Sequence, residues 1–316
     1  MSPQTRPDDG PDDVLDPTAL ARFGRLELLA RLAVEGMNAG SHRSPFKGSS
    51  VEFAEHRQYG PGDEIRRVDW RAYGKSDRYF VKEYEEETNL NAYLVVDSSA
   101  SMAYAGAGST KLEHARALAA TVAYLMLKQR DAVGLVAFGT TAGEPIPARS
   151  APGHFAVLCR ALELAEAAGE TPPSAALNEL AGRVDRRGLV VILTDAFEPL
   201  PDLIEALRHL RHRRHEVLLL HVLAPEEEEF PFRGPTRLRP LEHPGDARDV
   251  DPAAVRAAYL RRFRAFCNDL EGGALALGCD YHRASTAEPP GRTLLDYLAA
   301  RSARKGRRGA SAEGGR

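Results

Sequence analysis

The sequence predicts an α/β fold, in which a doubly wound, mostly parallel sheet is flanked by helices and preceded by an N-terminal helix and a small β-rich layer. From residue 91 onward, short apolar runs alternate with amphipathic helical patterns, and this alternation is typical of a parallel sheet. The runs at 92–96, 189–193 and 217–223 are apolar at nearly every position. Strands of that kind are buried on both faces, so we expect helices on both sides of the sheet.

The first 90 residues follow other patterns. Residues 1–16 are rich in Pro and Asp, and we expect them to be disordered. A helix is expected to begin at Asp16 and Pro17, because the aspartate can cap it and the proline fits its first turn. From residue 41 to 87 the sequence alternates and is broken by the turn signal Tyr59-Gly-Pro-Gly-Asp63. We therefore assign 17–90 to an N-terminal helix with a β-rich layer.

Residues 91–303 are predicted to form the α/β domain. Strands are expected at 92–96, 132–138, 189–193, 217–223 and 280–284, and helices at 111–128, 154–168, 174–184, 200–211, 252–270 and 292–303. An insertion at about 225–250 begins with four consecutive glutamates and lacks periodicity, so we expect a loop or short hairpin there. The basic tail 304–316 is expected to be disordered.

Composition narrows the class of protein. A net charge of −3 gives no general attraction to nucleic acid or to an anionic membrane. The three cysteines lack CxxC spacing, which argues against a disulfide framework or zinc cluster and favours a reducing compartment. No run approaches the roughly 20 apolar residues of a membrane span. We expect a cytoplasmic protein without membrane insertion, and the oligomeric state is left open.

Asp97, Ser99 and Ser101 form a DxSxS motif at the point where an apolar run ends. They offer only oxygen ligands, which Mg²⁺ and Mn²⁺ prefer to sulfur or imidazole. Two of these ligands are neutral hydroxyls, so a bound cation would still attract an anion. The alternative is an ordinary strand-to-helix turn, since Ser and Asp favour turns for their own hydrogen bonding.

Two further residues can join this motif. Thr171 stands at the start of a predicted helix, and Asp195 follows the apolar run at 189–193. In an open α/β sheet the loops at the carboxyl ends of the strands converge on one crevice. The sequence therefore predicts a metal site made of Asp97, Ser99, Ser101, Thr171 and Asp195.

These motifs resemble those of the von Willebrand factor type A domain, whose metal-ion-dependent adhesion site binds Mg²⁺. The resemblance implies that an open coordination position takes a carboxylate from a protein partner. In that family two glycines usually precede the threonine, whereas Glu170 replaces the second one here. Thr140 and Thr141 are therefore competing candidates for the role of Thr171.

A second resemblance covers about residues 20–301. The signature at 48–70, which includes Tyr59-Gly-Pro-Gly-Asp63 and ends in Val-Asp-Trp70, is similar to the bacterial family called domain of unknown function 58, as are segments 82–86, 280–286 and 294–298. Members of that family resemble von Willebrand type A proteins, and the likeness implies an adaptor that acts with a MoxR-type AAA+ ATPase.

Three classes of function remain. The leading hypothesis is a metal-dependent protein-interaction adaptor, with no catalytic residues assigned. A Mg²⁺-dependent phosphohydrolase using Asp97 as nucleophile is an alternative, but Ser99 stands where a second acid would be needed. A metal-free scaffold is the third. The run from Gly106 to Lys111 lacks GxxxxGK[ST] spacing and does not indicate a nucleotide site.

Overall fold

The computed structural model describes residues 25–39, 53–58, 80–84, 90–106, 108–139, 145–169, 171–184, 187–242, 245 and 247–313. The chain divides into two compact units, Arg43–Leu90 and the rest of the chain. In the smaller unit, strands β1 (Phe53–Gln58) and β2 (Phe80–Tyr84) pair antiparallel, which agrees with the predicted β-rich layer. The expected disorder at 1–16 lies outside the described residues.

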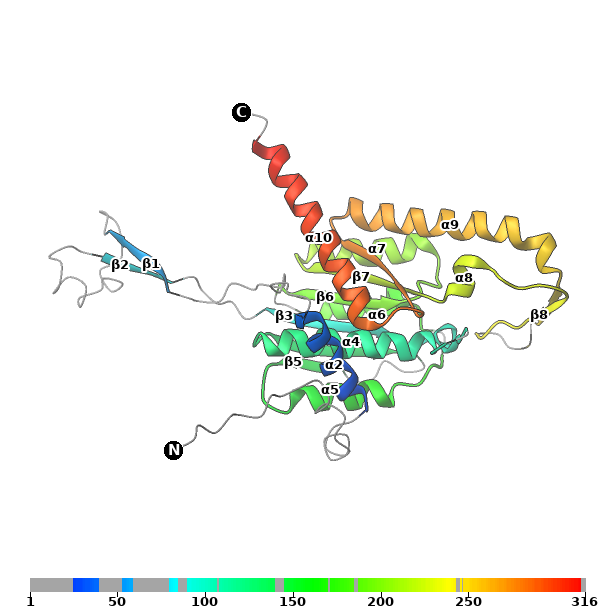
Figure 1. The fold of residues 1–316 in the computed structure, drawn as a ribbon, viewed down its shortest axis with the longest axis horizontal. Coiled ribbons are helices and arrows are strands. Elements are labelled where there is room, and N and C mark those ends of the chain that lie inside the picture. The colour runs from blue at the N-terminus through cyan, green and yellow to red at the C-terminus, as the bar shows by residue number, and fades with distance from the viewer. Residues whose placement is uncertain are drawn as a thin grey trace, which may run out of the picture. The chain divides into compact units, whose positions relative to one another are not determined.

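The larger unit is built on a six-stranded sheet with the order β10-β7-β6-β3-β4-β5 (Figure 1). Its strands are β3 (Asn91–Asp97), β4 (Ala132–Phe138), β5 (Ile146–Arg149), β6 (Leu189–Thr194), β7 (Glu216–Leu223) and β10 (Asp280–Ser285). All neighbours are parallel except β5, which is antiparallel to β4. The predicted fold class is confirmed. Strand β5 was missed because its four residues include a proline, which strands tolerate mainly at an edge.

The strand order places a switch in chain direction at β3. From β3 the chain proceeds outward to β4 and β5, and then crosses back to β6 on the other side of β3 before continuing to β7 and β10. The loop at the carboxyl end of β3 therefore leads toward β4, whereas the loop at the carboxyl end of β6 leads the opposite way, toward β7. Crevices at such switch points are where open α/β sheets bind ligands.

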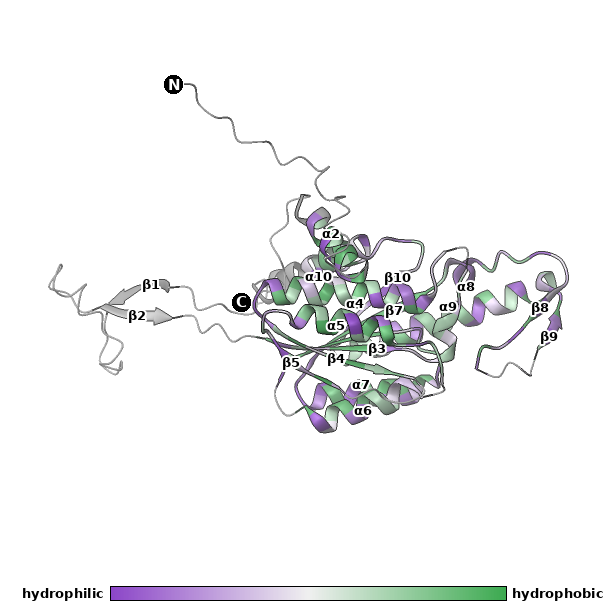
Figure 2. Ribbon diagram, turned by 90° about the horizontal axis from the view of Figure 1, so that it is seen from below, coloured by the Kyte–Doolittle hydropathy of each residue, from purple (hydrophilic) through white to green (hydrophobic). Residues whose placement is uncertain are grey.

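Helices cover both faces of the sheet (Figure 2). One face carries α4 (Lys111–Lys128), α5 (His154–Leu164) and α10 (Pro290–Glu313), and the other carries α6 (Pro173–Arg183), α7 (Leu200–His212) and the second half of α9 (Pro252–Ala276). Val95, Ile192 and Leu219 pack in one core cluster with α6 and α7. Burial on both faces explains why these strands are apolar throughout.

Helix α4 has a well-defined start. The Thr110 side chain accepts a hydrogen bond from the Glu113 N–H (3.0 Å), and the Glu113 carboxylate accepts one from the Thr110 N–H (2.9 Å). This capping box fixes the first turn of α4. The side chain of Lys111, the first residue of α4, is thereby held at the same edge of the sheet as the end of β3.

The N-terminal helix α2 (Arg25–Ala39) belongs to the larger unit. Its buried residues Leu26, Ala30, Val34 and Met37 recur at helical spacing, and the helix packs on α4, α5 and α10. Our assignment of this helix to one region with the β-rich layer is therefore wrong. The reason is that an apolar stripe shows that a helix is covered but not by which element.

Several element ends differ from expectation. Helix α5 ends at Leu164, α9 continues to Ala276, and α10 continues to Glu313. The expected disordered tail is therefore wrong over 304–313, where Ala, Arg and Lys favour helix. The insertion contains the short helix α8 (Pro225–Glu229) and a hairpin of β8 (Thr236–Leu238) with β9 (Arg248–Val250), as one of the two expectations had it. No described helix is long and apolar enough to span a membrane.

His114 on α4 gives the fold a pH dependence that can be measured. It is 4% exposed, its Nε2 has no hydrogen-bond partner among the described residues, and burial lowers its pKa to about 4 from an ordinary 6.5. Between these values the unfolded state binds a proton that the folded state does not. The free energy of unfolding should fall by about 1.4 kcal/mol per pH unit on this account as pH drops below 6.5.

We expect His114→Leu to reduce the slope of the free energy of unfolding against pH by about 1.4 kcal/mol per pH unit below 6.5, measured by urea unfolding at pH 7 to 4.5. The buried His221, whose pKa is also lowered to about 4, keeps its own contribution in both proteins. The control is His212→Leu, since His212 is exposed on α7 and its replacement should leave the slope unchanged. Equal slopes in the wild type and His114→Leu would contradict the prediction.

Candidate functional site

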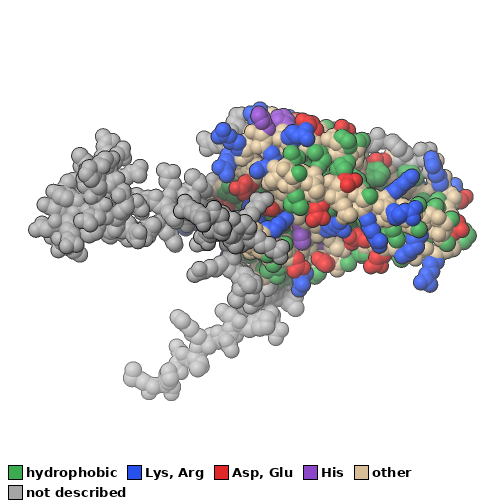
Figure 3. Space-filling model, turned by 90° about the horizontal axis from the view of Figure 1, so that it is seen from above, with side chains coloured by type: hydrophobic (Ala, Val, Ile, Leu, Met, Phe, Trp, Pro, Cys, Tyr) green, Lys and Arg blue, Asp and Glu red, His purple; other side chains and the backbone are tan. Residues whose placement is uncertain are grey.

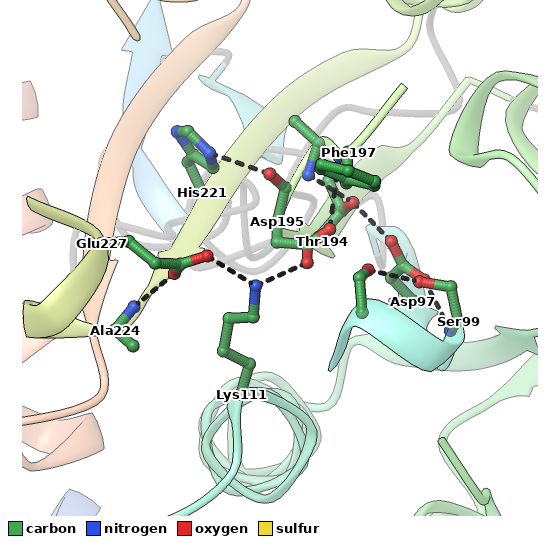
Figure 4. Close-up of polar contacts among 11 residues, drawn as sticks. Asp97, Ser99, Lys111, Thr194, Asp195, Phe197, His221, Ala224 and Glu227 are labelled. Atoms are coloured by element: carbon green, nitrogen blue, oxygen red, sulfur yellow. Dashed lines mark hydrogen bonds and ion pairs between the residues drawn. The ribbon is translucent and has the colours of Figure 1, made fainter. Parts of the chain in front are cut away.

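Asp97 ends strand β3 and is 1% exposed. Its Oδ1 accepts a hydrogen bond from the Ser99 N–H (2.9 Å), and its Oδ2 accepts one from the Thr194 hydroxyl (2.6 Å) (Figure 4). Thr194 ends the neighbouring strand β6, and Val96 is paired with Leu193 in the register. The parallel pairing of β3 and β6 therefore brings Asp97 and the Thr194–Asp195 pair to the same edge.

The two serines of the motif lie together. Ser99 directly precedes the 3₁₀ helix η3 (Ala100–Ala103). The Oγ atoms of Ser99 and Ser101 are 3.1 Å apart, and both side chains are buried. Adjacent ligands in an octahedral site with bonds of 2.1 Å are about 3.0 Å apart. The spacing fits a hydrogen bond between the hydroxyls and also two adjacent ligand positions.

The segment that carries Thr171 lies against the DxSxS loop. The Ala100 N–H donates to the Gly169 carbonyl (3.1 Å), and the Ala168 N–H donates to the Ser98 carbonyl (2.9 Å). Thr171 is half-buried and its hydroxyl donates to the Gly139 carbonyl. A hydroxyl has one hydrogen and two lone pairs, so this bond leaves the oxygen able to bind a cation. The competing candidates Thr140 and Thr141 lie outside the described residues.

Asp195 is engaged by a lysine that sequence reasoning missed. Lys111 Nζ lies 2.7 Å from Asp195 Oδ2 and 3.0 Å from Glu227 Oε1, and its side chain is 3% exposed (Figure 4). The ammonium also lies 5.7 Å from the centre of the Tyr104 ring, within range of a cation–π contact. The sequence did contain one signal. A lysine at the first position of a helix is disfavoured by the helix dipole, so a nearby carboxylate is expected to pair with it.

The charges of the site perturb one another. Burial, and then the charge of Asp195, raise the pKa of Asp97 to about 7, against the effect of the hydrogen bonds from Thr194 and Ser99. For Lys111, burial alone would lower the pKa, but Asp195 and Glu227 raise it above its ordinary value. The protonated, positively charged form of Lys111 is therefore favoured. The ionised form of Asp97 is disfavoured.

His221 on β7 forms a hydrogen bond with the backbone of Asp195. Its Nδ1 is 2.9 Å from the Tyr281 hydroxyl, and its Nε2 is 3.1 Å from the Asp195 carbonyl oxygen. Because a carbonyl can only accept, Nε2 carries the hydrogen and Nδ1 accepts from Tyr281. Burial lowers the pKa of His221 to about 4, so the ring is neutral and holds the Asp195 backbone in place.

The donor set fits a hard cation. The described residues contain no group of three or more His, Cys, Asp or Glu side chains that can hold a metal, so binding here must use hydroxyls beside carboxylates. Asp97, Ser99 and Ser101 supply such oxygens at one point, which suits Mg²⁺ or Mn²⁺ and not the nitrogen and sulfur preference of zinc. Asp195 has one oxygen on Lys111 and accepts the Phe197 N–H with the other (3.2 Å). The metal site stays a prediction.

Comparison with known proteins identifies the family. Residues 55–266 match the model described as protein of unknown function DUF58. The chain belongs to this family. Uncharacterized protein Rv1480 of Mycobacterium tuberculosis is 31% identical over 265 residues, covering 79% of this chain and 81% of that protein. Uncharacterized protein YeaD of Bacillus subtilis is 25% identical over 130 residues, or 41% of this chain and 30% of that protein. The resemblance predicted from the signature segments is confirmed.

Solved structures give more distant likenesses. The conserved hypothetical protein BatB from Bacteroides thetaiotaomicron is 16% identical with a TM-score of 0.43, covering 67% of this chain and 98% of that one. The SpRpn10 VWA domain is 11% identical with a TM-score of 0.39, at 66% and 94% coverage. Manganese-loaded TRAP from Plasmodium vivax is 21% identical with a TM-score of 0.30, at 42% and 56%. Likenesses this distant carry no function across, and the architecture of this chain rests on its own strand order.

The convergence of the loops depends on Gly139. A Cβ at this position would lie 2.5 Å from the Ser98 carbonyl oxygen and 2.6 Å from that of Ala168. Both are backbone atoms, so Gly139→Ala must push the loops apart, and we expect a loss of about 1–3 kcal/mol in the free energy of unfolding.

The matched control is Gly182→Ala. Gly182 lies in α6, where an added Cβ meets nothing within 4 Å, so this change should raise the free energy of unfolding by up to about 1 kcal/mol. Urea unfolding of both variants checks the prediction. The same sign for both would show that Gly139 does not hold the loops together.

Proposed function

We propose that this chain is a protein-interaction adaptor that holds a divalent cation with Asp97, Ser99 and Ser101 and presents it to a carboxylate of a partner protein. The pair of buried hydroxyls 3.1 Å apart, next to the buried Asp97 at the β3–β6 switch point, carries this proposal. A bound Mg²⁺ or Mn²⁺ would supply a strong electrophile with a position for the partner's oxygen.

The charge balance favours a cation beside Asp97. Lys111 pairs with Asp195 and Glu227, whereas no described lysine or arginine forms an ion pair with Asp97. A buried carboxylate without a cationic partner is costly. A divalent cation would offset that cost and would favour the ionised form of Asp97.

The same balance favours an acidic partner. The serine ligands and Thr171 are neutral, and the charge of Asp195 is already matched by Lys111. A divalent cation held by one carboxylate keeps a net positive charge. In a site this buried, an incoming carboxylate would be attracted strongly, and water or a neutral group would compete poorly.

The partner class comes from the family resemblance. It implies that this chain acts with a MoxR-type AAA+ ATPase, in keeping with its membership of the DUF58 family.

Two alternatives compete with the adaptor. A phosphohydrolase using Asp97 would need a general acid nearby, but the residue two positions on is Ser99, whose hydroxyl pairs with that of Ser101. A metal-free scaffold has one observation in its favour, because the Lys111 ammonium already satisfies Asp195 without a metal. Binding of the metal decides between scaffold and adaptor.

We expect saturating Mg²⁺ to stabilise the wild type, by about 2.7 kcal/mol at 100 times its Kd. Asp97→Asn should abolish this gain. Without metal, the same variant should be as stable as the wild type or more so, because it removes the repulsion between two buried carboxylates. Urea unfolding in Mg²⁺ and in EDTA measures all four free energies.

Ser98→Ala is the control for this experiment. The Ser98 hydroxyl donates to the Phe138 carbonyl (2.7 Å) and is not part of the predicted ligand set, so the variant should keep the gain from Mg²⁺. If Mg²⁺ leaves the wild type unchanged up to millimolar concentration, the metal-free scaffold is the better description.

The partner prediction is tested with purified proteins. We expect a MoxR-type ATPase from the same organism to bind the immobilised wild type in Mg²⁺ and to be released by EDTA. Asp97→Asn should weaken binding at least about tenfold, since an interaction through a fully desolvated charge is worth more than about 1.4 kcal/mol. Equal binding in Mg²⁺ and EDTA would show that the metal does not bridge the two proteins.

A further inference from the structure

A large groove opens beside Asp195. It has a volume of about 1130 Å³ and is formed by the ends of β6 and β7, by α8, by the hairpin β8–β9 and by the first half of α9. Its lining is mostly apolar and includes five aromatic side chains, namely Phe197, Phe230, Tyr259, Phe263 and Phe266. Grooves with mostly apolar walls and a few polar groups at one end are typical binding sites.

Helix α9 supplies one wall of this groove and is covered over only part of its length. In the second half of the helix, Cys267, Leu270 and Ala274 are buried, and the helix packs there on α7 and β10. Nearer the start of the helix, Tyr259, Phe263 and Phe266 follow the same helical spacing but are only half-buried, and of the three only Phe266 also packs against the core cluster. The apolar stripe of α9 thus extends beyond the part that the sheet covers.

The aromatic rings form a connected row. Phe230 lies 4.6 Å from Tyr259, and Tyr259 is stacked on Phe263 at 5.8 Å, measured between ring centres. These contacts fix the rings in the groove wall. A preformed aromatic wall binds an apolar side chain at little cost in conformational entropy.

Phe197 lines the groove, and its N–H donates to the carboxylate of Asp195. It is 69% exposed, the highest value among the large apolar side chains that the structure describes as exposed. Its position follows from Ala196, which has φ of +55° in the left-handed region and is itself buried. A non-glycine residue in that region is strained, and such strain is concentrated at functional sites.

The charges around the groove indicate what it binds. Its lining includes the carboxylates of Asp195, Glu198 and Glu227 and the guanidinium groups of Arg248 and Arg262. Lys111, which pairs with Asp195 and Glu227, adds a third positive charge, so the three carboxylates are balanced by three cations. A divalent cation at Asp97 would make this end positive overall. In Figure 3, basic side chains lie among apolar ones at the right-hand end, where α9 begins.

We infer that the groove binds a large apolar side chain from the same partner segment whose carboxylate reaches the cation, so that the partner carries an acidic residue close to an aromatic or aliphatic one. This inference rests on the proposed function. Asp195 belongs both to the predicted metal site and to the groove lining, so one short segment can contact both. The apolar contact would supply affinity, and the carboxylate would supply orientation and metal dependence.

Synthetic peptides test the two contacts separately. We would use acetylated, fluorescein-labelled peptides in a Gly/Ser background, each with one aspartate and a pair of phenylalanines two, four or six residues later. Matched peptides replace the phenylalanines by serines or the aspartate by asparagine. Binding is measured by fluorescence anisotropy in Mg²⁺ and in EDTA.

We expect the best phenylalanine peptide to bind the wild type at least about tenfold more tightly than its serine counterpart in both buffers, as burial of an aromatic side chain predicts. The aspartate should matter only in Mg²⁺. Phe197→Ser and Phe263→Ser should each remove most of the preference for phenylalanine. The control Leu164→Ser changes a side chain on α5 that is 66% exposed and distant in the fold, and it should preserve the preference.

The two proposals fail in different ways. Equal binding of phenylalanine and serine peptides, with a normal response to Mg²⁺ and aspartate, overturns the groove inference and leaves the proposed function intact. A preference for phenylalanine with no effect of Mg²⁺ or aspartate refutes the metal bridge and retains the groove as an apolar site.

Two other occupants are tested directly. Deletion of residues 1–16, which contain five aspartates and a Val-Leu pair, would tighten binding of the phenylalanine peptide about tenfold if this segment filled the groove. A second copy of the chain would give a dimer in sedimentation that Phe263→Ser dissociates. Either result overturns the inference, whereas unchanged affinity and no groove-dependent dimer support it.

Discussion

Two carboxylates held at the ends of neighbouring buried strands are the constraint on which the site depends. Strands β3 and β6 are parallel and adjacent, so Asp97 and Asp195 are brought to one edge by the same backbone pairing that forms the sheet. In a buried environment their repulsion is weakly screened. Local contacts offset this repulsion. Thr194 and Ser99 donate hydrogen bonds to Asp97, and Lys111 pairs with Asp195.

Lys111 connects this site to the insertion. Its ammonium, held at the start of α4, pairs with Asp195 of the sheet and Glu227 of α8. The Glu227 carboxylate also accepts the Ala224 N–H (2.8 Å) at the end of β7. The position of α8, which carries Phe230 at its end, is thereby linked to the charge state of the β6 terminus. The ion pairs Asp195–Lys111–Glu227 therefore connect the end of β6 to the wall of the aromatic groove.

The sequence predicted the features that depend on local pattern. Apolar strands and helical periodicity placed β3, β4, α4 and most of the remaining elements, because burial on both faces leaves a continuous apolar run that turns interrupt. Asp97 and Asp195 were placed at one edge by the rule that parallel strands end together. Membership of the DUF58 family followed from the signature segments.

What the sequence did not predict depends on tertiary contacts. Lys111 reads as a surface residue, because its burial arises only when α4 docks beside β6. The association of α2 with α4 and α10 was missed for the same reason. The groove was missed because Tyr259, Phe263 and Phe266 have the spacing of an ordinary core face. Only the structure shows that the sheet ends before that face does.

Two costs in free energy and one exposed aromatic ring meet at the β3–β6 switch point, and their coincidence argues for a binding site over a simple turn. Asp97 is buried without a cationic partner among the described residues, Ala196 is held in the left-handed region, and Phe197 is left in contact with water. A loop that served only to connect elements would be more stable without the buried carboxyl group and the left-handed residue, and it would not need the exposed ring. Natural sequences retain such costs mainly where binding requires them. A cation beside Asp97 would stabilise its charge, and an apolar partner side chain would cover Phe197, so the proposed ligands offset the costs that the isolated fold leaves exposed.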